Sequence, residues 1–400
     1  MAKPRLNPRL PRAIWVLGFV SMLMDISSEM IHGLLPVFMV SVLGASMTTV
    51  GLVEGVGEAV ASMTKLFSGW ASDRLRRRKA LAVLGYTLAA FTKPLFALAP
   101  SVGWVLAARF ADRVGKGIRG APRDALIGDL VPAGSRGAAF GLRQSLDTVG
   151  AVAGPLLAVA LMALFADQFR LVFWLAVIPA FAAAGLLFLG VSDPEPKAAP
   201  AGAPPVRLRR EFSTLGARYW WVVVLGCVLT LARFSEAFLI LRAGSLGLPI
   251  ALAPMVLVAM NVVYALSAYP IGVLSDHMEQ KHLLVMGFVV LILADGVLAF
   301  ADGLPLAFAG IALWGLHMGM TQGLLSVLVA DTAPERLRAT AFGLFNFASG
   351  AALLGASLLA GVLWDDIGPR GTFLAGAGIT LVGLVGCVGL LPGGRRTGTA

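Results

Sequence analysis

Charged residues are scarce in this sequence. Asp, Glu, Lys and Arg make up 14% of the 400 residues, whereas a soluble globular protein usually contains about 25%. Hydrophobic residues make up 58%, and the mean hydropathy is +0.84. So little polar surface excludes a water-soluble protein, and we predict that most of the chain lies in a lipid bilayer.

Cysteine is scarce as well, because Cys227 and Cys387 are the only two. Both lie in apolar runs, so nothing indicates a disulfide framework or a thiolate metal site, and we interpret them as small buried side chains. A nucleotide-binding fingerprint is also lacking. Residues 115–120 (GKGIRG) are rich in glycine, but they lie inside a predicted membrane span without the strand that such a loop follows. We therefore expect no cofactor, no ATP-driven pump and no enzyme.

Long apolar runs, by contrast, are abundant. A helix needs about 20 apolar residues to cross the hydrocarbon layer, and the sequence contains twelve runs of about this length. The first run is too long for a signal peptide and lacks a cleavage site, so we interpret it as a retained span. This pattern predicts an all-α integral membrane protein whose spans are residues 13–42, 48–71, 80–98, 102–130, 137–165, 169–191, 218–243, 250–274, 282–301, 305–330, 340–364 and 371–391.

The net charge of +10 would suit a nucleic-acid partner, but the position of the loop cations indicates another cause. Lysines and arginines outside the spans gather at one end of them, and only Arg170, Arg242 and Arg370 lie at the other end. Cytoplasmic loops of membrane proteins carry such an excess. We therefore predict an inner-membrane protein with both termini in the cytoplasm and no nucleic-acid partner.

The chain is predicted to divide into two similar halves. Residues 192–210 are rich in Pro, Ala and charge, as expected of a linker. Residues 69–73 match 272–276, and residues 129–142 match 331–344, which indicates an internal duplication. The predicted parts are a cytoplasmic N-terminus (1–12), a six-helix bundle (13–191), a cytoplasmic linker (192–217), a second six-helix bundle (218–391) and a cytoplasmic tail (392–400).

The residues after the second span resemble a signature of the major facilitator superfamily. Gly69, Asp73 and Arg74, followed by a basic run that ends at Lys79, match the family's loop between its second and third helices, with Arg76 in place of the usual second glycine. The resemblance covers essentially the whole chain. It implies two pseudo-symmetric bundles that rock about a central cavity, lined by the first and fourth helix of each half, and secondary transport by alternating access.

The same segment and its copy are predicted to form a cytoplasmic gate. A carboxylate at a helix end accepts hydrogen bonds from the free amides of a neighbouring helix, and arginines bridge to nearby carboxylates. Setting topology requires cations but no carboxylate, so Asp73 favours a gate, whereas a purely topological role stays open for the cations. The predicted gate residues are Gly69, Asp73, Arg74, Arg77, Asp129, Arg136, Asp276, Asp331 and Arg338.

The fifth span carries Gly150, Gly154 and Pro155, which resemble part of a motif found in proton-exchanging exporters of that superfamily. Small residues four positions apart let helices approach closely, and proline permits a kink. A hinge and simple helix packing therefore both explain these residues. We take them as a candidate hinge that favours export.

Charged residues inside the predicted spans are concentrated in the first half. Each one costs about 2.5–3.5 kcal/mol at the centre of a bilayer, so a cluster requires pairing, water or a function. With about 100° of rotation per residue, Asp25, Glu29 and His32 share one face of the first span. A second stripe, which we expect to face the first across a wet cavity, runs along the fourth span through Arg109, Arg113, Lys116 and Arg123, with Arg119 beside it.

Three interpretations of these stripes stay open. They form a structural salt-bridge lattice, or Asp25, Glu29 and His32 bind a divalent metal, or a carboxylate exchanges a proton while the cations bind an anion. The metal is disfavoured because the facing cations would repel it, and we predict no resident metal. We favour the third interpretation, with Asp25 ahead of Glu29 because of its central depth. The proton-coupling candidates are Asp25, Glu29, Glu54 and Glu58.

Polar residues of both halves complete the predicted substrate site. The uncharged ones in the second half are explained equally by helix packing. The substrate-binding candidates are His32, Arg109, Arg113, Lys116, Arg119, Arg123, Arg233, Glu236, Asn261, Tyr264, His317, Gln322 and Asn346. The predicted function is proton-coupled export of a small, amphipathic anion by a monomer. Import of an organic anion or siderophore, export of a divalent metal and a non-transporting sensor are the alternatives.

Overall fold

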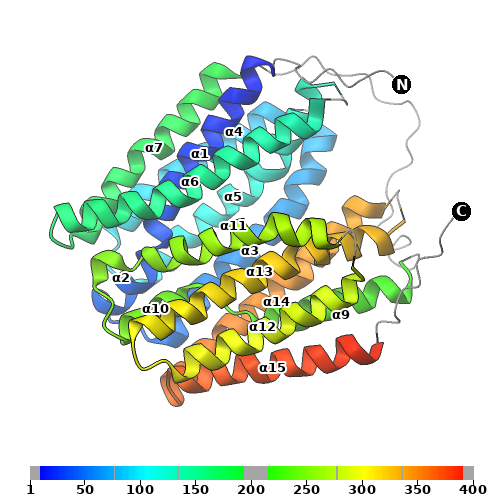
Figure 1. Ribbon diagram of the computed structural model, residues 1–400. Helices are drawn as coiled ribbons and strands as arrows, with labels where there is room; N and C mark the ends of the chain where they lie inside the picture. The colour runs from blue at the N-terminus through cyan, green and yellow to red at the C-terminus, as the bar shows by residue number, and fades with distance from the viewer. Residues whose placement is uncertain are drawn as a thin grey trace, which may run out of the picture. The chain divides into compact units, whose positions relative to one another are not determined.

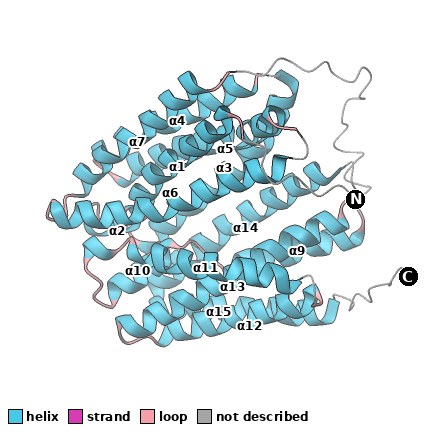
Figure 2. Cartoon of the chain, turned by 45° about the horizontal axis from the view of Figure 1, so that its top comes forward, coloured by secondary structure: helices cyan, strands magenta, loops and turns pink. Residues whose placement is uncertain are grey.

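The computed structural model describes residues 10–75, 77–132, 135–192, 215–275, 278–334 and 337–390. All regular structure in these residues is helical, with no strand among them (Figure 2). The helices of the first half are α1 (Arg12–His32), α2 (Leu35–Ser41), α3 (Met47–Leu75), α4 (Arg78–Leu98), α5 (Val102–Leu130), α6 (Arg136–Leu164) and α7 (Phe169–Gly190) (Figure 1). Those of the second half are α9 (Ala217–Ala232), α10 (Ala237–Ser245), the short 3₁₀ helix η2 (Ile250–Leu252), α11 (Met255–Ser275), α12 (Gln280–Phe300), α13 (Leu304–Thr332), α14 (Arg338–Asp366) and α15 (Pro369–Leu390).

The prediction of an all-α membrane protein is confirmed. Ten stretches of the described residues are helical, long and apolar enough to cross a membrane. The two remaining long helices, α3 and α5, have 29 residues each and carry more charge. Together these elements account for the twelve predicted spans.

Two of the predicted spans are broken into two helices. The first is interrupted at Gly33 and Leu34, because Pro36 has no N–H to bond the carbonyl of His32 and its ring clashes there, whereas proline is accepted in the first turn of a new helix. The seventh is interrupted between Ala232 and Ala237, where the hydroxyl of Ser235 accepts a hydrogen bond from the amide of Ala237 and so assists the start of α10.

Residue contacts divide the chain into two compact units. Unit 1 comprises residues 1–38 and 60–202, and unit 2 comprises residues 39–59 and 203–400. The N-terminal part of α3 therefore clusters with unit 2 and the rest of that helix with unit 1. The predicted bundles had placed residues 39–59 in the first half, and their exact boundaries stay a prediction.

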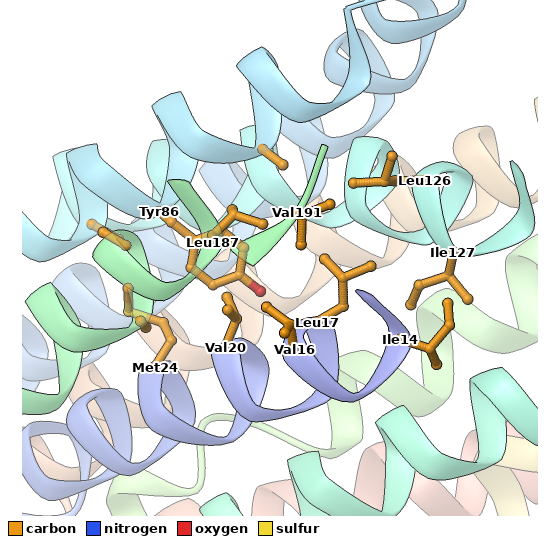
Figure 3. Close-up of a cluster of buried hydrophobic side chains, with 14 of the residues drawn as sticks. Ile14, Val16, Leu17, Val20, Met24, Tyr86, Leu126, Ile127, Leu187 and Val191 are labelled. Carbon is orange, nitrogen blue, oxygen red and sulfur yellow. The ribbon is translucent and has the colours of Figure 1, made fainter. Parts of the chain in front are cut away.

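The apolar core of unit 1 lies on one face of α1. Ile14, Val20 and Met24 are fully buried there, together with Tyr86 of α4 and Leu187 of α7 (Figure 3). α1 packs chiefly on α6 and α7, and α4 packs on α5 and α7. The core holds α1 in place and leaves a different face of this helix for its charged residues.

Two arginines close the ends of equivalent helices in the two units. Arg170 donates hydrogen bonds to the carbonyl oxygens of Ala97 and Ala99, at 2.9 and 2.8 Å, just where α4 ends. Arg242 does the same where α12 ends, with the carbonyl oxygens of Leu298 and Ala301 at 2.9 and 2.7 Å. Each arginine thus satisfies carbonyl groups that a helix C-terminus leaves without a partner.

Candidate functional site

The cations of α5 form the centre of the charged region in unit 1. Arg109, Arg113 and Arg119 are 3%, 5% and 5% exposed, whereas Lys116 is exposed. The guanidinium of Arg119 lies over the ring of Tyr86, 4.9 Å from its centroid. Guanidinium groups this well buried are costly to keep unless they meet anions or aromatic faces, so their number on one helix points to an anionic partner.

The carboxylates of α1 interact with these cations. Glu29 lies within electrostatic range of Lys116 and Arg113, and Asp25 within range of Lys116 and Arg119. Asp25 is half-buried and makes no direct ion pair with a described residue. The two stripes therefore belong to one electrostatic network. Their roles in coupling and substrate binding remain predictions.

The two glycines of the predicted hinge contact the carboxylate-bearing face of α1. A Cβ atom on Gly150 would lie 2.7 Å from the carbonyl oxygen of Met22 and 3.0 Å from Cβ of Asp25. A Cβ atom on Gly154 would lie 2.8 Å from Cβ of Glu29. Glycine is thus required at both positions for α6 to approach α1 so closely. Pro155 lies inside α6, which continues through it as one helix, and the hinge motion stays a prediction.

A chain of ion pairs joins α5 to α6. Arg123 hydrogen-bonds the hydroxyl of Ser21 at 2.9 Å and contacts Asp124 at 3.1 Å. Asp124 also accepts a hydrogen bond from Arg143, which pairs in turn with Asp147, one turn away on α6. The direct partner of Asp147 is thus a neighbour on its own helix.

A fully buried ion pair lies deeper in unit 1. Nζ of Lys93 on α4 is 2.8 Å from Oδ1 of Asp112 on α5, and the two residues are 1% and 4% exposed. Lys93 also donates to Ser28 at 3.1 Å, and Thr92 to Asp112 at 3.3 Å. Neither residue is among the site residues predicted from the sequence. Their pairing depends on a contact between two helices, which spacing along one helix does not reveal.

The other predicted proton-coupling residues lie on the part of α3 that clusters with unit 2. Glu54 is 1% exposed, and Glu58 is half-buried. The contact-defined units thus separate them from Asp25 and Glu29.

Of the predicted substrate residues of unit 2, two lie in the break between α9 and α10, and the others lie on α11, α13 and α14. Arg233 and Glu236 are half-buried within the break and interact electrostatically. His317 on α13 is fully buried, with Nδ1 2.8 Å from the carbonyl oxygen of Gly287 on α12. This contact occupies one ring nitrogen of His317, and its role in substrate binding stays a prediction. The remaining candidates are Asn261, Tyr264 and Gln322, which are half-buried, and Asn346, which is exposed.

Two residues of the predicted cytoplasmic gate have described side chains. Arg77 is exposed. Asp129 pairs with Arg78, which also donates to the carbonyl oxygen of Ala125 at 3.0 Å. The gate residues whose side chains lie outside the described part of the chain are Gly69, Asp73, Arg74, Arg136, Asp276, Asp331 and Arg338.

The carboxylate of Asp365 on α14 caps the start of α3, and this contact was not predicted from the sequence. The backbone amides of Met47 and Thr48 donate to the two carboxylate oxygens of Asp365, at 3.0 and 2.8 Å, while Ser46 accepts from the amide of Thr49. An anion at a helix N-terminus is favourable, because the first amides have no partner within the helix. The site joins residues 318 positions apart, so local sequence gave no signal for it.

Metal coordination has no obvious location among the described residues. No group of three or more His, Cys, Asp or Glu side chains in the described part of the chain is arranged to hold an ion. The Nδ1 atom of His32 is 3.6 Å from Oε2 of Glu29. These two residues, which belong to the disfavoured metal alternative, are therefore partners of each other.

Comparison with known sequences gives a consistent result. The sequence profile described as Major Facilitator Superfamily matches residues 17–350 and 235–398. An uncharacterized MFS-type transporter of Methanocaldococcus jannaschii is 33% identical over 386 residues, which cover 93% of each chain. A multidrug efflux pump of Mycolicibacterium fortuitum is 31% identical over 120 residues, which cover 30% of this chain and 29% of the pump.

Comparison with solved structures shows the same fold. The crystal structure of a nucleoside transporter superposes with a TM-score of 0.78 and 14% sequence identity, covering 94% of this chain and 99% of the other. At this identity the likeness concerns the arrangement of the helices and carries no information on substrate.

Proposed function

Because the chain belongs to the Major Facilitator Superfamily, we propose that it is a proton-coupled secondary transporter that exports a small, amphipathic anion by alternating access. The observation that supports this proposal best is the electrostatic network of unit 1, in which Asp25 and Glu29 of α1 lie within range of Lys116 of α5. A carboxylate and a substrate anion that share cations in this way are energetically coupled.

The proposed coupling works through competition for cations. When Asp25 is ionised, it attracts Lys116 and Arg119. When Asp25 takes up a proton, that attraction is lost, and the cations become available to an anion. Export requires in addition that the protein reorients with either the proton or the anion bound, and not with both. Arg109 and Arg113 offer planar N–H forks that match a carboxylate or phosphate group. Gly150 of α6 packs closely on α1 next to Asp25. A movement of α1 that follows the change in charge of Asp25 would therefore also move α6.

Export is supported by two observations. The segment Gly150 to Pro155 resembles a motif of proton-exchanging exporters, and a multidrug efflux pump is 31% identical over 120 residues. The proposal includes an inner-membrane location with both termini cytoplasmic, a monomeric transporter and a cytoplasmic gate formed by the residues named above.

Import of an organic anion is the second candidate, and the charge arrangement favours it. Because protonation of Asp25 releases cations of α5, a proton and an anion would load at the same side of the membrane. An inward proton gradient would then drive uptake.

A binding screen and a flux assay test the proposal in sequence. Thermal shift of the purified protein is measured with aromatic carboxylates, siderophores, cationic drugs and divalent metals. We expect stabilisation by an amphipathic carboxylate that is lost in Arg113→Gln and retained in Arg218→Gln, because Arg218 is exposed at the start of α9.

The best-binding carboxylate is then loaded into proteoliposomes with a pH-sensitive dye in the lumen. We expect a proton gradient to drive flux that Asp25→Asn abolishes, whereas Asp167→Asn, in the exposed turn before α7, retains it. Substrate moving against the proton identifies export, and movement with the proton identifies import. Proton-driven flux in Asp25→Asn at the wild-type rate would remove Asp25 from the coupling role.

A further inference from the structure

Asp295 on α12 is a buried acid that has no hydrogen-bond partner among the described residues. It is 0% exposed, and neither carboxylate oxygen has a hydrogen-bond partner among the described residues. No charged group in the described part of the chain interacts with it electrostatically. This isolation sets it apart from the carboxylates of unit 1, which lie among cations.

Asp295 lies against Gly376 of α15, which is also in contact with the broken span. A Cβ atom on Gly376 of α15 would lie 2.8 Å from Oδ2 of Asp295, 3.2 Å from the carbonyl oxygen of Ala232 and 3.2 Å from the ring of Phe234. The carboxyl group, the last residue of α9 and the first residues of the break thus all lie against the same point of α15. The ring of Phe234 packs on those of Trp314 and Phe373, each with centroids 5.4 Å apart.

An ionised carboxylate in such a place is very costly. Burial of a charge requires a counter-ion or several hydrogen bonds, whereas a neutral carboxyl group requires much less. A sodium ion would need several oxygen ligands, and no second carboxylate of a described residue interacts with Asp295. A proton requires no further ligand. We propose that Asp295 is a proton-binding site of unit 2 and that it carries its proton in the conformation described here.

Release of this proton requires a new partner for the carboxylate, and the break contains an arginine that does not interact with Asp295 in this conformation. Arg233 follows Ala232 directly in the break, and its buried Nη1 atom has no hydrogen-bond partner among the described residues. When the proton leaves Asp295 for water, an ion pair between the carboxylate and Arg233 compensates the charge that remains. The four residues between α9 and α10 are not helical, so Arg233 can turn without unwinding a helix.

The other charged groups on elements packed against α12 are already engaged elsewhere. Arg242 is bonded to carbonyl oxygens at the end of α12, Arg370 lies over Phe300, and His317 is bonded to Gly287. Glu236 interacts with Arg233 itself and would compete with Asp295 for it. The remaining groups at the start of α12 are Lys281, which donates to Val388, and His282, which lies beside Glu279.

This inference rests on the proposed proton coupling only for the use of the site in transport, and the site itself is testable without transport. Infrared difference spectra of the purified protein between low and high pH are recorded in water and in heavy water. We expect a protonated carboxyl band that is absent in Asp295→Asn and present in Asp302→Asn, because Asp302 is exposed just beyond α12. In Asp295→Glu the band should persist at a shifted frequency. This variant replaces Asp295→Asn as the test if the asparagine variant does not fold.

Two further measurements decide the ligand and the partner. Arg233→Gln should retain the band at a pH at which the wild-type protein has lost it, because the ionised form has lost its counter-ion. A band unaffected by Asp295→Asn and Asp295→Glu would overturn the proposal, as would a band abolished by sodium chloride at constant pH, which would identify a sodium site. If instead the band behaves as expected but flux does not depend on pH, the proton site stands and the proposed function fails.

Discussion

Asp112 in unit 1 and Asp295 in unit 2 are both buried aspartates, yet their surroundings are opposite. Asp112 receives hydrogen bonds from Lys93 and Thr92, whereas Asp295 receives none from any described residue. The positions are related by the internal repeat. Lys93 and Asp295 are each the sixteenth residue of a 21-residue helix, and Asp112 and Trp314 are each the eleventh residue of a 29-residue helix. One repeat thus places an ion pair at positions where the other has an aspartate and a tryptophan.

Buried charged residues can have two different roles in a membrane protein, stabilising the packing of helices or binding a proton. A complete ion pair between α4 and α5 stabilises one arrangement of the helices, because breaking it would leave a buried charge. An isolated acid has two forms of different charge and so responds to a proton. The four predictions below test this contrast, beginning with the largest expected effect.

Removal of one partner of the buried pair should be the most damaging change. We expect Asp112→Asn to lower stability by about 3–5 kcal/mol, because Lys93 is then buried without a counter-ion. The measurement is thermal unfolding in detergent, followed by fluorescence-detected gel filtration. The double variant Lys93→Met/Asp112→Leu should recover most of the loss, and a double variant as unstable as the single one would show that the pair is not the cause.

The close packing of α6 on α1 is the second point of contrast. Gly150 and Gly154 correspond in the repeat to Ala352 and Ala356 of α14. We expect Gly150→Ala to destabilise by about 1–3 kcal/mol, because the new methyl group meets the carbonyl oxygen of Met22 at 2.7 Å and the backbone there must shift. Ala352→Gly, the reverse exchange at the equivalent position of unit 2, should cost only about 0.5–1 kcal/mol. Equal losses in the two variants would show that the glycines have no special packing role.

The cap on α3 should have a smaller effect. We expect Asp365→Ala to cost about 1 kcal/mol, because the amides of Met47 and Thr48 lose their acceptor. The neighbouring exposed residue supplies the control, since Asp366→Ala leaves both amides satisfied. Thermal unfolding of the two variants at the same pH is the measurement, and an equal loss in both would assign the effect to general charge rather than to the cap.

Asp295→Asn should change stability least. An amide has nearly the shape of a neutral carboxyl group, so the change in free energy of unfolding should stay within about 1 kcal/mol. The comparison with Asp112→Asn under identical conditions sharpens the contrast between the units. A loss as large as that of Asp112→Asn would mean that Asp295 is ionised and paired, contrary to the proposed proton site.

Much of the fold was predictable from the sequence, and specific residues show why. Apolar runs of about 20 residues and the helical spacing of Asp25 and Glu29 are local properties, and the structure retains both. The interruption of the first span was not predicted, although Gly33 and Pro36 are present in the sequence. A span is recognised from the mean hydropathy of about 20 residues, and two residues hardly change that mean. The interruption near Ser235 had a weaker signal, since a serine in an apolar run is common.

The sequence by itself determined that this chain crosses a membrane as α-helices in two related halves with most of its buried charge in the first, because hydropathy and helical periodicity act over a few turns. The tertiary structure alone decided which charges are matched. Lys93 meets Asp112 because α4 packs on α5, and Asp365 reaches the start of α3 across 318 positions. Asp295 is buried against Gly376 of α15 without a hydrogen-bond partner among the described residues. The cost of a buried charge depends on the few ångströms around it, and those distances are set by helices far apart in the sequence.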